Sequence, residues 1–148
     1  MDNETAAYVA ITRLQHAYAD VVNRRAWSEL ANLFLPDAPV SVDTMTNPVV
    51  ETTGPTEIGN FIEGAIERFA FFEFTILSAH VEIAGDTARA RLYMCELRQD
   101  HEGEFSRAFG VYRDMYRRHD DRWWFAARKY QSLARTGGEV FPFPEEQW

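Results

Sequence analysis

The chain has 148 residues, of which 15 are basic and 23 acidic, so its net charge at neutral pH is −8. A chain of this length can bury roughly two thirds of its unfolded surface, and we expect one domain, residues 1–148, whose core needs no disulfide or metal. The negative charge repels phosphate backbones and anionic lipid headgroups, which argues against nucleic acid and membranes as partners.

The cysteine content and the N-terminal residues predict a cytoplasmic protein. Cys95 is the only cysteine, so no intrachain disulfide can form. The N-terminal segment, residues 1–5, is acidic and lacks the basic and apolar regions of a secretory signal. No apolar run approaches the roughly 20 residues that span a bilayer.

The first part of the chain is predicted to be helical. Ile11 and Tyr18 lie at helical spacing on one face of an amphipathic helix over residues 5–24. A second, short helix is expected over residues 27–34. Pro36 ends it, because proline cannot continue the hydrogen-bond ladder.

A third helix follows two short predicted strands. The strands span residues 38–45 and 49–53, on either side of a breaking Asn-Pro pair. Thr56 is expected to cap the helix, whose buried stripe runs from Ile58 to Phe69.

The second half of the chain has the alternating pattern of strands. Residues 74–83 and 87–98 are expected to form a hairpin, and two more strands span residues 105–118 and 123–135. Helices followed by a meander predict an α+β fold, with three N-terminal helices packed on one face of a curved antiparallel sheet.

This sheet is predicted to enclose a ligand. Aromatic or aliphatic side chains occupy nearly every second position of residues 108–118 and 123–128, as on a concave wall. Glu96 is expected on the same strand face as Leu92 and Met94, because strand side chains alternate. An acid on an apolar face is costly unless it pairs with a base or has a chemical role.

Five segments, in this order, resemble the SnoaL-like group of the nuclear transport factor two superfamily. They are residues 18–30, the helix end at 34–38, the turn at 85–88, and the strand segments 110–114 and 122–125. The resemblance implies a cone-shaped α+β barrel with a deep hydrophobic pocket, assembled as a homodimer or homotrimer through the outer sheet face. It covers residues 5–135 and leaves a C-terminal tail, residues 136–148. Members of the superfamily include dehydratases, isomerases, polyketide cyclases, dioxygenase subunits and proteins that only bind.

The resemblance also assigns site residues. Tyr18 matches the tyrosine that dehydratases of this kind carry in the first helix, and Glu96 falls approximately where bile-acid-type dehydratases carry an acid. The family's acid after the first helix is Asn23 here, and its histidine is Phe74. Neither side chain exchanges protons near neutrality, so the usual Asp/His relay is absent.

Two interpretations follow. In the first, Glu96 and Tyr18 are catalytic: desolvation disfavours the ionised carboxyl group of Glu96, which shuttles a proton, while Tyr18 and Tyr112 bind a substrate oxygen. This would be a cofactor-independent lyase, isomerase or cyclase acting on a hydrophobic, uncharged or weakly polar cyclic compound such as a polyketide or steroid-like molecule. In the second, the protein only binds a hydrophobic small molecule or serves as an oligomeric scaffold. The expected substrate-binding residues are Asn23, Phe61, Phe74, Met94, Tyr112 and Asp114.

Structural roles are open for the same residues. Tyr18 fits the core stripe of its helix, Asn23 is typical of a helix end, and Asp114 could be a solvated strand residue. Glu96 could pair with an arginine across the sheet. The candidate partners are Arg91, Arg98 and Arg107.

Metal binding is not predicted. His16 and Asp20 lie one helical turn apart, and His80 and Glu82 share one side of a strand, but neither pair has a third ligand nearby in sequence.

The tail joins a flexible pair, Gly137 and Gly138, to three aromatic residues, Phe141, Phe143 and Trp148. It could close over the pocket mouth as a lid, cross to a neighbouring subunit, or fray.

Overall fold

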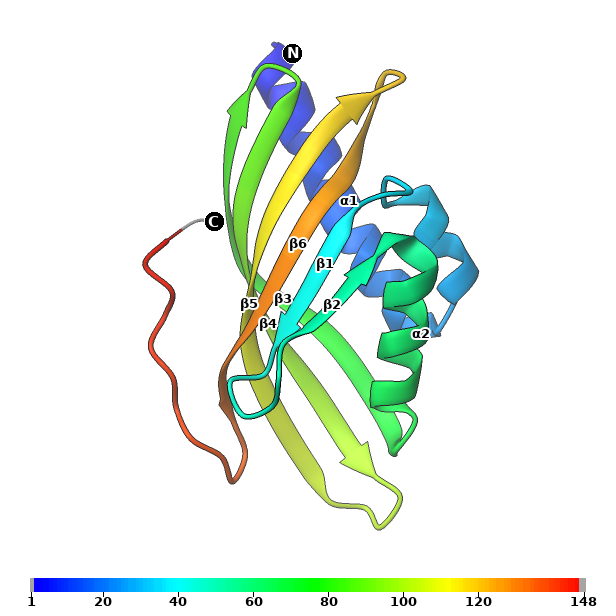
Figure 1. Ribbon diagram of the computed structural model, residues 1–148, viewed down its shortest axis with the longest axis vertical. Coiled ribbons are helices and arrows are strands. Elements are labelled where there is room, and N and C mark those ends of the chain that lie inside the picture. Colours follow the sequence, from blue (N-terminus) through cyan, green and yellow to red (C-terminus); the bar gives the residue numbers. More distant parts are fainter. Residues whose placement is uncertain (1, 147–148) are drawn as a thin grey trace.

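The computed structural model describes residues 2–146 as helices packed on one twisted sheet (Figure 1). The helical elements are α1 (Asn3–Arg24), the short 3-10 helix η1 (Trp27–Asn32) and α2 (Gly54–Ile66). The strands are β1 (Pro39–Asp43), β2 (Val50–Thr53), β3 (Phe69–Ala84), β4 (Thr87–Asp100), β5 (Phe105–His119) and β6 (Arg122–Arg135). Within these residues no helix combines the length and the apolar character needed to cross a membrane.

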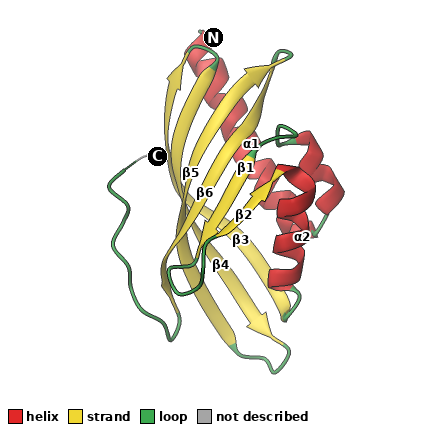
Figure 2. Ribbon diagram, in the orientation of Figure 1, coloured by secondary structure: helices red, strands yellow, loops and turns green. Residues whose placement is uncertain are grey.

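The six strands form one sheet in the order β2-β1-β6-β5-β4-β3 (Figure 2). The α+β class and the antiparallel meander from β3 to β6 are confirmed. The prediction of a wholly antiparallel sheet is wrong in one place, because β1 pairs with β6 in parallel. In residues 2–146, β2 and β3 are the two edges of the sheet, so the expected cone is an open one.

The helices begin and end close to the predicted positions. Asp2 caps α1, since its carboxylate accepts a hydrogen bond from the Thr5 amide at 2.7 Å. Thr56 is not the cap of α2, because that helix begins two residues earlier, at Gly54. Gly54 has φ of +82°, and a Cβ there would lie 2.5 Å from the carbonyl oxygen of Pro36, so the tight entry to α2 requires glycine.

The core lies between the helices and the concave face of the sheet. Helix α1 packs against β3 and β6, while α2 packs against η1 and β2. Ile11 and Leu30 are fully buried there, together with Leu92 of β4 and Phe125 of β6. This packing fills one end of the concave face, and the space under α2 at the other end is left for the site.

The tail lies on the outer face of the sheet rather than over the concave face. The Phe141 amide donates to the carbonyl oxygen of Leu133 at 2.8 Å, and the Phe143 ring lies 5.7 Å from that of Tyr93. Figure 1 shows this segment, in red, running alongside the sheet and well apart from α2. Of the alternatives open for the tail, residues 136–146 do not take the place of a lid over the cavity, and Trp148 lies outside the described residues.

Candidate active site

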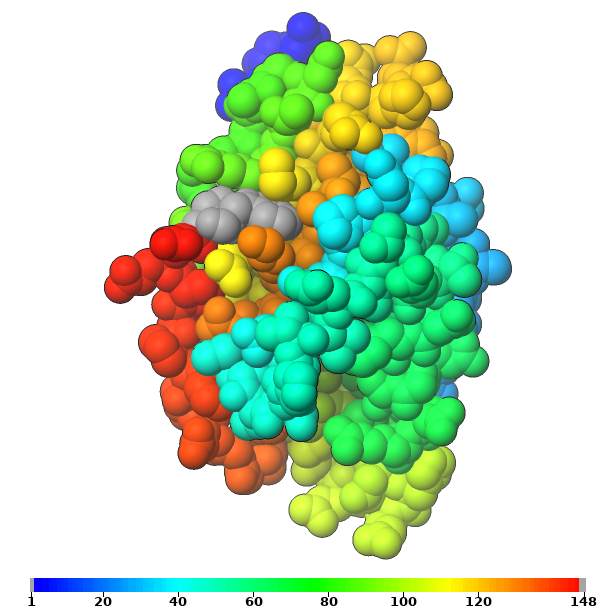
Figure 3. Space-filling view, in the orientation of Figure 1, coloured from blue at the N-terminus to red at the C-terminus, as the bar shows by residue number. Residues whose placement is uncertain are grey.

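A cavity of about 220 Å³ lies between α2, the end of α1 and the concave sheet face. Figure 3 shows a hollow between the β1–β2 loop and α2, with β4 and β5 behind it. Aliphatic and phenyl side chains form much of the wall: Val22, Val40, Val42, Ile58, Phe61, Ile62, Ile66, Phe69, Phe72 and Phe74. Three phenols and four charged groups also line it: Tyr18, Tyr112, Tyr130, Arg68, Glu96, Arg98 and Arg135. The remaining lining residues are Thr44, Asn47 and Ala65.

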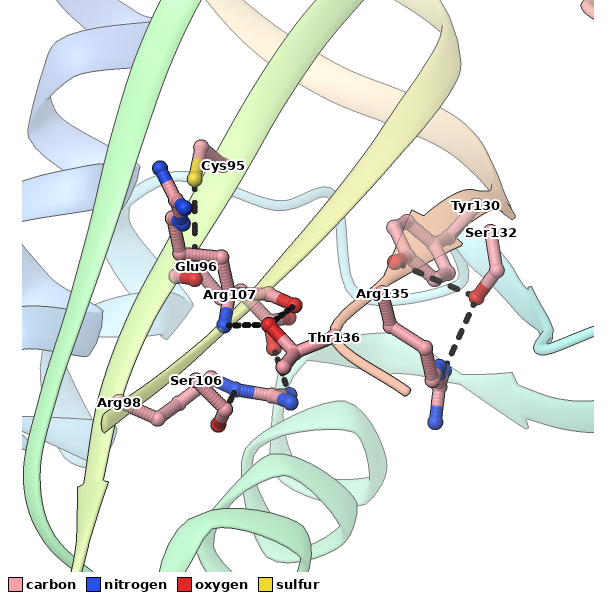
Figure 4. A network of polar contacts seen from close by, with 9 residues as sticks. All are labelled: Cys95, Glu96, Arg98, Ser106, Arg107, Tyr130, Ser132, Arg135 and Thr136. Atoms are coloured by element: carbon pink, nitrogen blue, oxygen red, sulfur yellow. Dashed lines mark hydrogen bonds and ion pairs between the residues drawn. The ribbon is translucent and has the colours of Figure 1, made fainter. Parts of the chain in front are cut away.

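Glu96 points into this cavity from β4, as its strand position predicts. Its side chain is 23% exposed, and Oε1 accepts one hydrogen bond from Nη1 of Arg98 at 3.2 Å (Figure 4). Arg98 is held in turn by Ser106, whose Oγ accepts from Nε at 3.1 Å. Burial raises the pKa of the Glu96 carboxyl group, and the positive charges of Arg98, Arg135 and Arg68 offset only part of that rise.

The phenols are neutral donors. The hydroxyl groups of Tyr18 and Tyr112 lie 3.5 Å apart, and burial raises the pKa of both. Burial, reinforced by the charge of Glu96, raises the pKa of Tyr130 to about 12. Tyr130 was not among the predicted site residues, although it lines the cavity with its ring 5.1 Å from that of Tyr112. A Cβ at position 110 would overlap the Tyr130 ring. Glycine at this position therefore leaves room for the ring.

A buried ion pair lies behind the phenols. Arg128 is 1% exposed and Asp114 is not exposed at all, and two hydrogen bonds of 2.6 and 3.1 Å join them. Tyr116 donates a third hydrogen bond to Asp114 at 2.7 Å. The Arg128 guanidinium carbon lies 3.8 Å from the ring centre of Tyr112 and 4.4 Å from that of Tyr18. A fixed positive charge thus lies directly behind the two phenols.

Three predicted substrate-binding residues lie outside the cavity lining. Asp114 is held in the core by its arginine, and Met94 is fully buried. Asn23 joins α1 to β3: its Nδ2 donates to the Phe74 carbonyl at 3.1 Å, and its Oδ1 accepts from the Phe74 amide at 2.6 Å. An ionised carboxylate has no proton to donate, so it could not make both of these hydrogen bonds.

The other five predicted residues do meet at the cavity. They are Tyr18, Phe61, Phe74, Glu96 and Tyr112. The geometry therefore offers one carboxyl group, neutral phenols and an apolar wall. No three His, Cys, Asp or Glu side chains of residues 2–146 come together as a set of metal ligands.

Helices on a concave open sheet, with a cavity between them, define the class of nuclear transport factor two-like folds. The chain belongs to the SnoaL-like domain family, whose model matches residues 3–129. No curated protein matches the sequence.

Solved structures share this fold along most of the chain. A candidate scytalone dehydratase from Novosphingobium aromaticivorans is 21% identical, with a TM-score of 0.79 over 93% of this chain and 91% of that one. A hexachlorocyclohexane dehydrochlorinase from Novosphingobium barchaimii is 20% identical, with a TM-score of 0.79 over 95% and 97%. An NTF2-like protein with a cystatin-like fold from N. aromaticivorans is 21% identical, with a TM-score of 0.75 over 87% and 83%. At these identities the likeness establishes the fold.

Proposed function

We propose that this protein is a cofactor-independent lyase, isomerase or cyclase that moves a proton on a hydrophobic cyclic small molecule. The observation that carries the proposal is the carboxyl group of Glu96 in the cavity wall, with a pKa raised by burial. General acid–base catalysis works best when the pKa of the group lies near the working pH, and the shift is in that direction.

Glu96 is the proton carrier in this scheme. As a carboxylate it takes a proton from the carbon skeleton of the substrate, and as a carboxylic acid it returns one to carbon or to a leaving oxygen. Its single hydrogen bond to Arg98 orients the carboxyl group and leaves it able to change partners. Tyr130 lines the same cavity, and the charge of Glu96 contributes to its raised pKa.

Tyr18 and Tyr112 bind the substrate oxygen. Both are neutral at physiological pH, so each can donate its proton to an oxygen that becomes negative as the carbon is deprotonated. The buried charge of Arg128, behind both rings, favours that negative charge further.

The cavity favours a compact substrate. Its 220 Å³ is below the roughly 300–1,000 Å³ typical of ligand pockets, so one or two rings fit better than a four-ring steroid. Phe61 and Phe74 offer aromatic surface to those rings. Two structural neighbours are named as a dehydratase and a dehydrochlorinase, which supports an elimination among the three reaction types.

Hydrogen exchange tests the proposal without knowledge of the product. One- and two-ring ketones, beginning with 1-tetralone, are incubated with the protein in D₂O, and deuterium incorporation next to the carbonyl is followed by NMR. We expect incorporation that depends on Glu96 and persists in Glu73→Gln, a variant of an exposed glutamate on β3 outside the cavity lining. Exchange that is equal in Glu96→Gln and the wild type would exclude Glu96 as the proton carrier.

Non-catalytic binding is the second candidate function. Asn23 and Phe74 stand at the two positions where the resemblance implies an acid and a histidine. The observation that favours this candidate is that the Asn23 amide forms two hydrogen bonds with the backbone of Phe74. Tight ligand binding with no exchange on any ketone of the panel would support this candidate over the enzyme.

We propose that the outer sheet face joins copies of the chain into a homodimer or homotrimer. Leu77, Met115 and Phe143 are 55%, 43% and 62% exposed, although all three are large and apolar. Light scattering of the wild type should give a mass of two or three chains.

Truncation after Gly138 should alter this assembly and leave the site intact, because the tail packs on the outer face and contributes nothing to the cavity lining within residues 2–146. We expect a changed mass by light scattering and unchanged ligand affinity by calorimetry. A loss of affinity with an unchanged mass would contradict both parts of this prediction.

A further inference from the structure

We infer that the ligand carries a carboxylate, and that Arg68, Arg98 and Arg135 bind it at the mouth of the cavity. The inference rests on the proposed function only for the position of the ligand in this cavity. It names the chemical class of the ligand, and it departs from the uncharged compound that the sequence suggested.

The charge of the cavity opposes that of the chain. The protein has 23 acidic and 15 basic residues, yet the charged lining consists of three arginines and one glutamate. The site therefore has a net charge of +2 inside a protein of charge −8. An apolar uncharged ligand gives no reason for this reversal.

The three arginines come from separate elements and meet only in the folded chain. Arg98 is on β4 and Arg135 on β6 (Figure 4), and both line the cavity. Arg68 follows α2, and its guanidinium carbon lies 4.8 Å from the ring centre of Phe69, while that of Arg98 lies 5.0 Å from the same ring. Two cations thus flank one phenyl group of the lining.

Only one of the three cations has an acidic partner in the described part of the chain. Some other arginines there form ion pairs, as Arg24 does with Glu29 and Arg89 with Glu82, and others form none. Among residues 2–146, Arg68 and Arg135 form no ion pair, and Arg98 shares the one acid of the lining. Glu96 can balance one of the three positive charges, and a bound carboxylate would balance a second.

A carboxylate fits the arrangement better than a neutral polar group. The planar guanidinium donates two parallel hydrogen bonds that match the two oxygens of a carboxylate. Beyond the arginines the cavity is lined by Ile58, Phe61 and Phe74, which suit the apolar part of the ligand. The ligand class is therefore an aromatic or alicyclic carboxylic acid, with its ring inside and its charged group at the mouth.

Calorimetry with a matched pair of probes tests this inference. 2-Naphthoate and 2-naphthamide have the same ring system and differ in charge. We expect naphthoate to bind at least about tenfold more tightly, since one charge-assisted hydrogen bond accounts for a factor of that size. Equal affinities for the acid and the amide would overturn the inference.

Two variants test whether the arginines cause the preference for naphthoate over naphthamide. Arg68→Gln and Arg135→Gln remove cations that have no ion pair in the described chain, so we expect both to fold. Each should lower naphthoate affinity about tenfold and leave naphthamide affinity unchanged. Arg117→Gln removes the same charge from an exposed position on β5 outside the lining and should change neither. An equal loss in Arg117→Gln would show that the overall charge, not the site, sets the preference.

Competition by inorganic phosphate tests whether the site binds the whole carboxylic acid or any small free anion. We expect phosphate to displace naphthoate only weakly, because phosphate makes no apolar contacts with the cavity wall. Phosphate binding as tight as that of naphthoate would overturn the inference. These measurements detect binding alone. If Glu96→Gln leaves exchange unchanged while naphthoate is still preferred, the proposed function fails and the ligand class stands.

Discussion

Glu96→Gln should lower kcat by roughly 100- to 10,000-fold on any substrate found by hydrogen exchange, which is the usual contribution of a positioned acid or base. Glutamine keeps the size of the side chain and an oxygen that can accept the hydrogen bond from Arg98. It cannot release or take up a proton near neutrality, so only the proton transfer is removed. Steady-state kinetics of the two proteins measures the effect, and KM should change much less than kcat.

The stability of the same variant distinguishes catalysis from a structural ion pair. Because burial raises the pKa of Glu96, the folded state holds this proton more tightly than the unfolded state does. The resulting stability is fully present below the unfolded pKa, about 4.3, and is lost as the pH rises through the higher folded pKa. Above the folded pKa the wild type has lost this stability, so Glu96→Gln should become as stable as the wild type or more stable as the pH rises.

Urea unfolding between about pH 4 and pH 8 measures this dependence. The free energy of unfolding of the wild type should fall relative to that of Glu96→Gln as the pH rises. If the variant were instead the less stable protein at pH 7, the attraction between Glu96 and Arg98 would dominate, and Glu96 would be a structural residue.

The predictions from sequence succeeded where the alternation of a strand is unbroken. In β4 the buried positions Ala88, Ala90, Leu92 and Met94 follow one another at a spacing of two, and Glu96 continues the same face. The inward direction of Glu96 could therefore be read directly from the chain. The position of β1 could not, because its parallel pairing with β6 joins segments far apart in sequence.

The missed residues lie beyond an irregularity in β6. Tyr116 pairs with Phe125 but Met115 pairs with Ala127, so one extra residue changes the phase of the alternation. In a regular strand with Trp123 facing inward, residues 128 and 130 would face outward. Because of the extra residue, Arg128 and Tyr130 face inward. Asp114 was expected among the substrate-binding residues, but it lies in the core beside Arg128. The meeting of Arg128 with Asp114 across neighbouring strands could not be predicted, because it depends on the irregularity in β6.

Asp114→Asn should lower the free energy of unfolding by about 3–5 kcal/mol, the usual cost of removing one partner of a buried ion pair. Arg128 would then remain as an uncompensated charge with 1% of its surface exposed, surrounded by the rings of Tyr18, Tyr112 and Phe125. The amide is almost the same size as the carboxylate, so the change isolates the charge. Urea denaturation measures the decrease in the free energy of unfolding.

Two further variants show whether burial is the cause. Asp20→Asn breaks an ion pair with Arg24 in which the side chains are 65% and 48% exposed, and it should cost less than about 1 kcal/mol. The double variant Asp114→Leu with Arg128→Met removes both buried charges and should recover much of the stability that Asp114→Asn loses, since apolar replacement of a whole buried pair is often neutral. If Asp114→Asn cost no more than Asp20→Asn, the pair would be solvated and could not hold a positive charge behind the phenols. The contribution of Arg128 to binding a negative substrate oxygen would then be lost from the mechanism, while that of Glu96 would be unaffected.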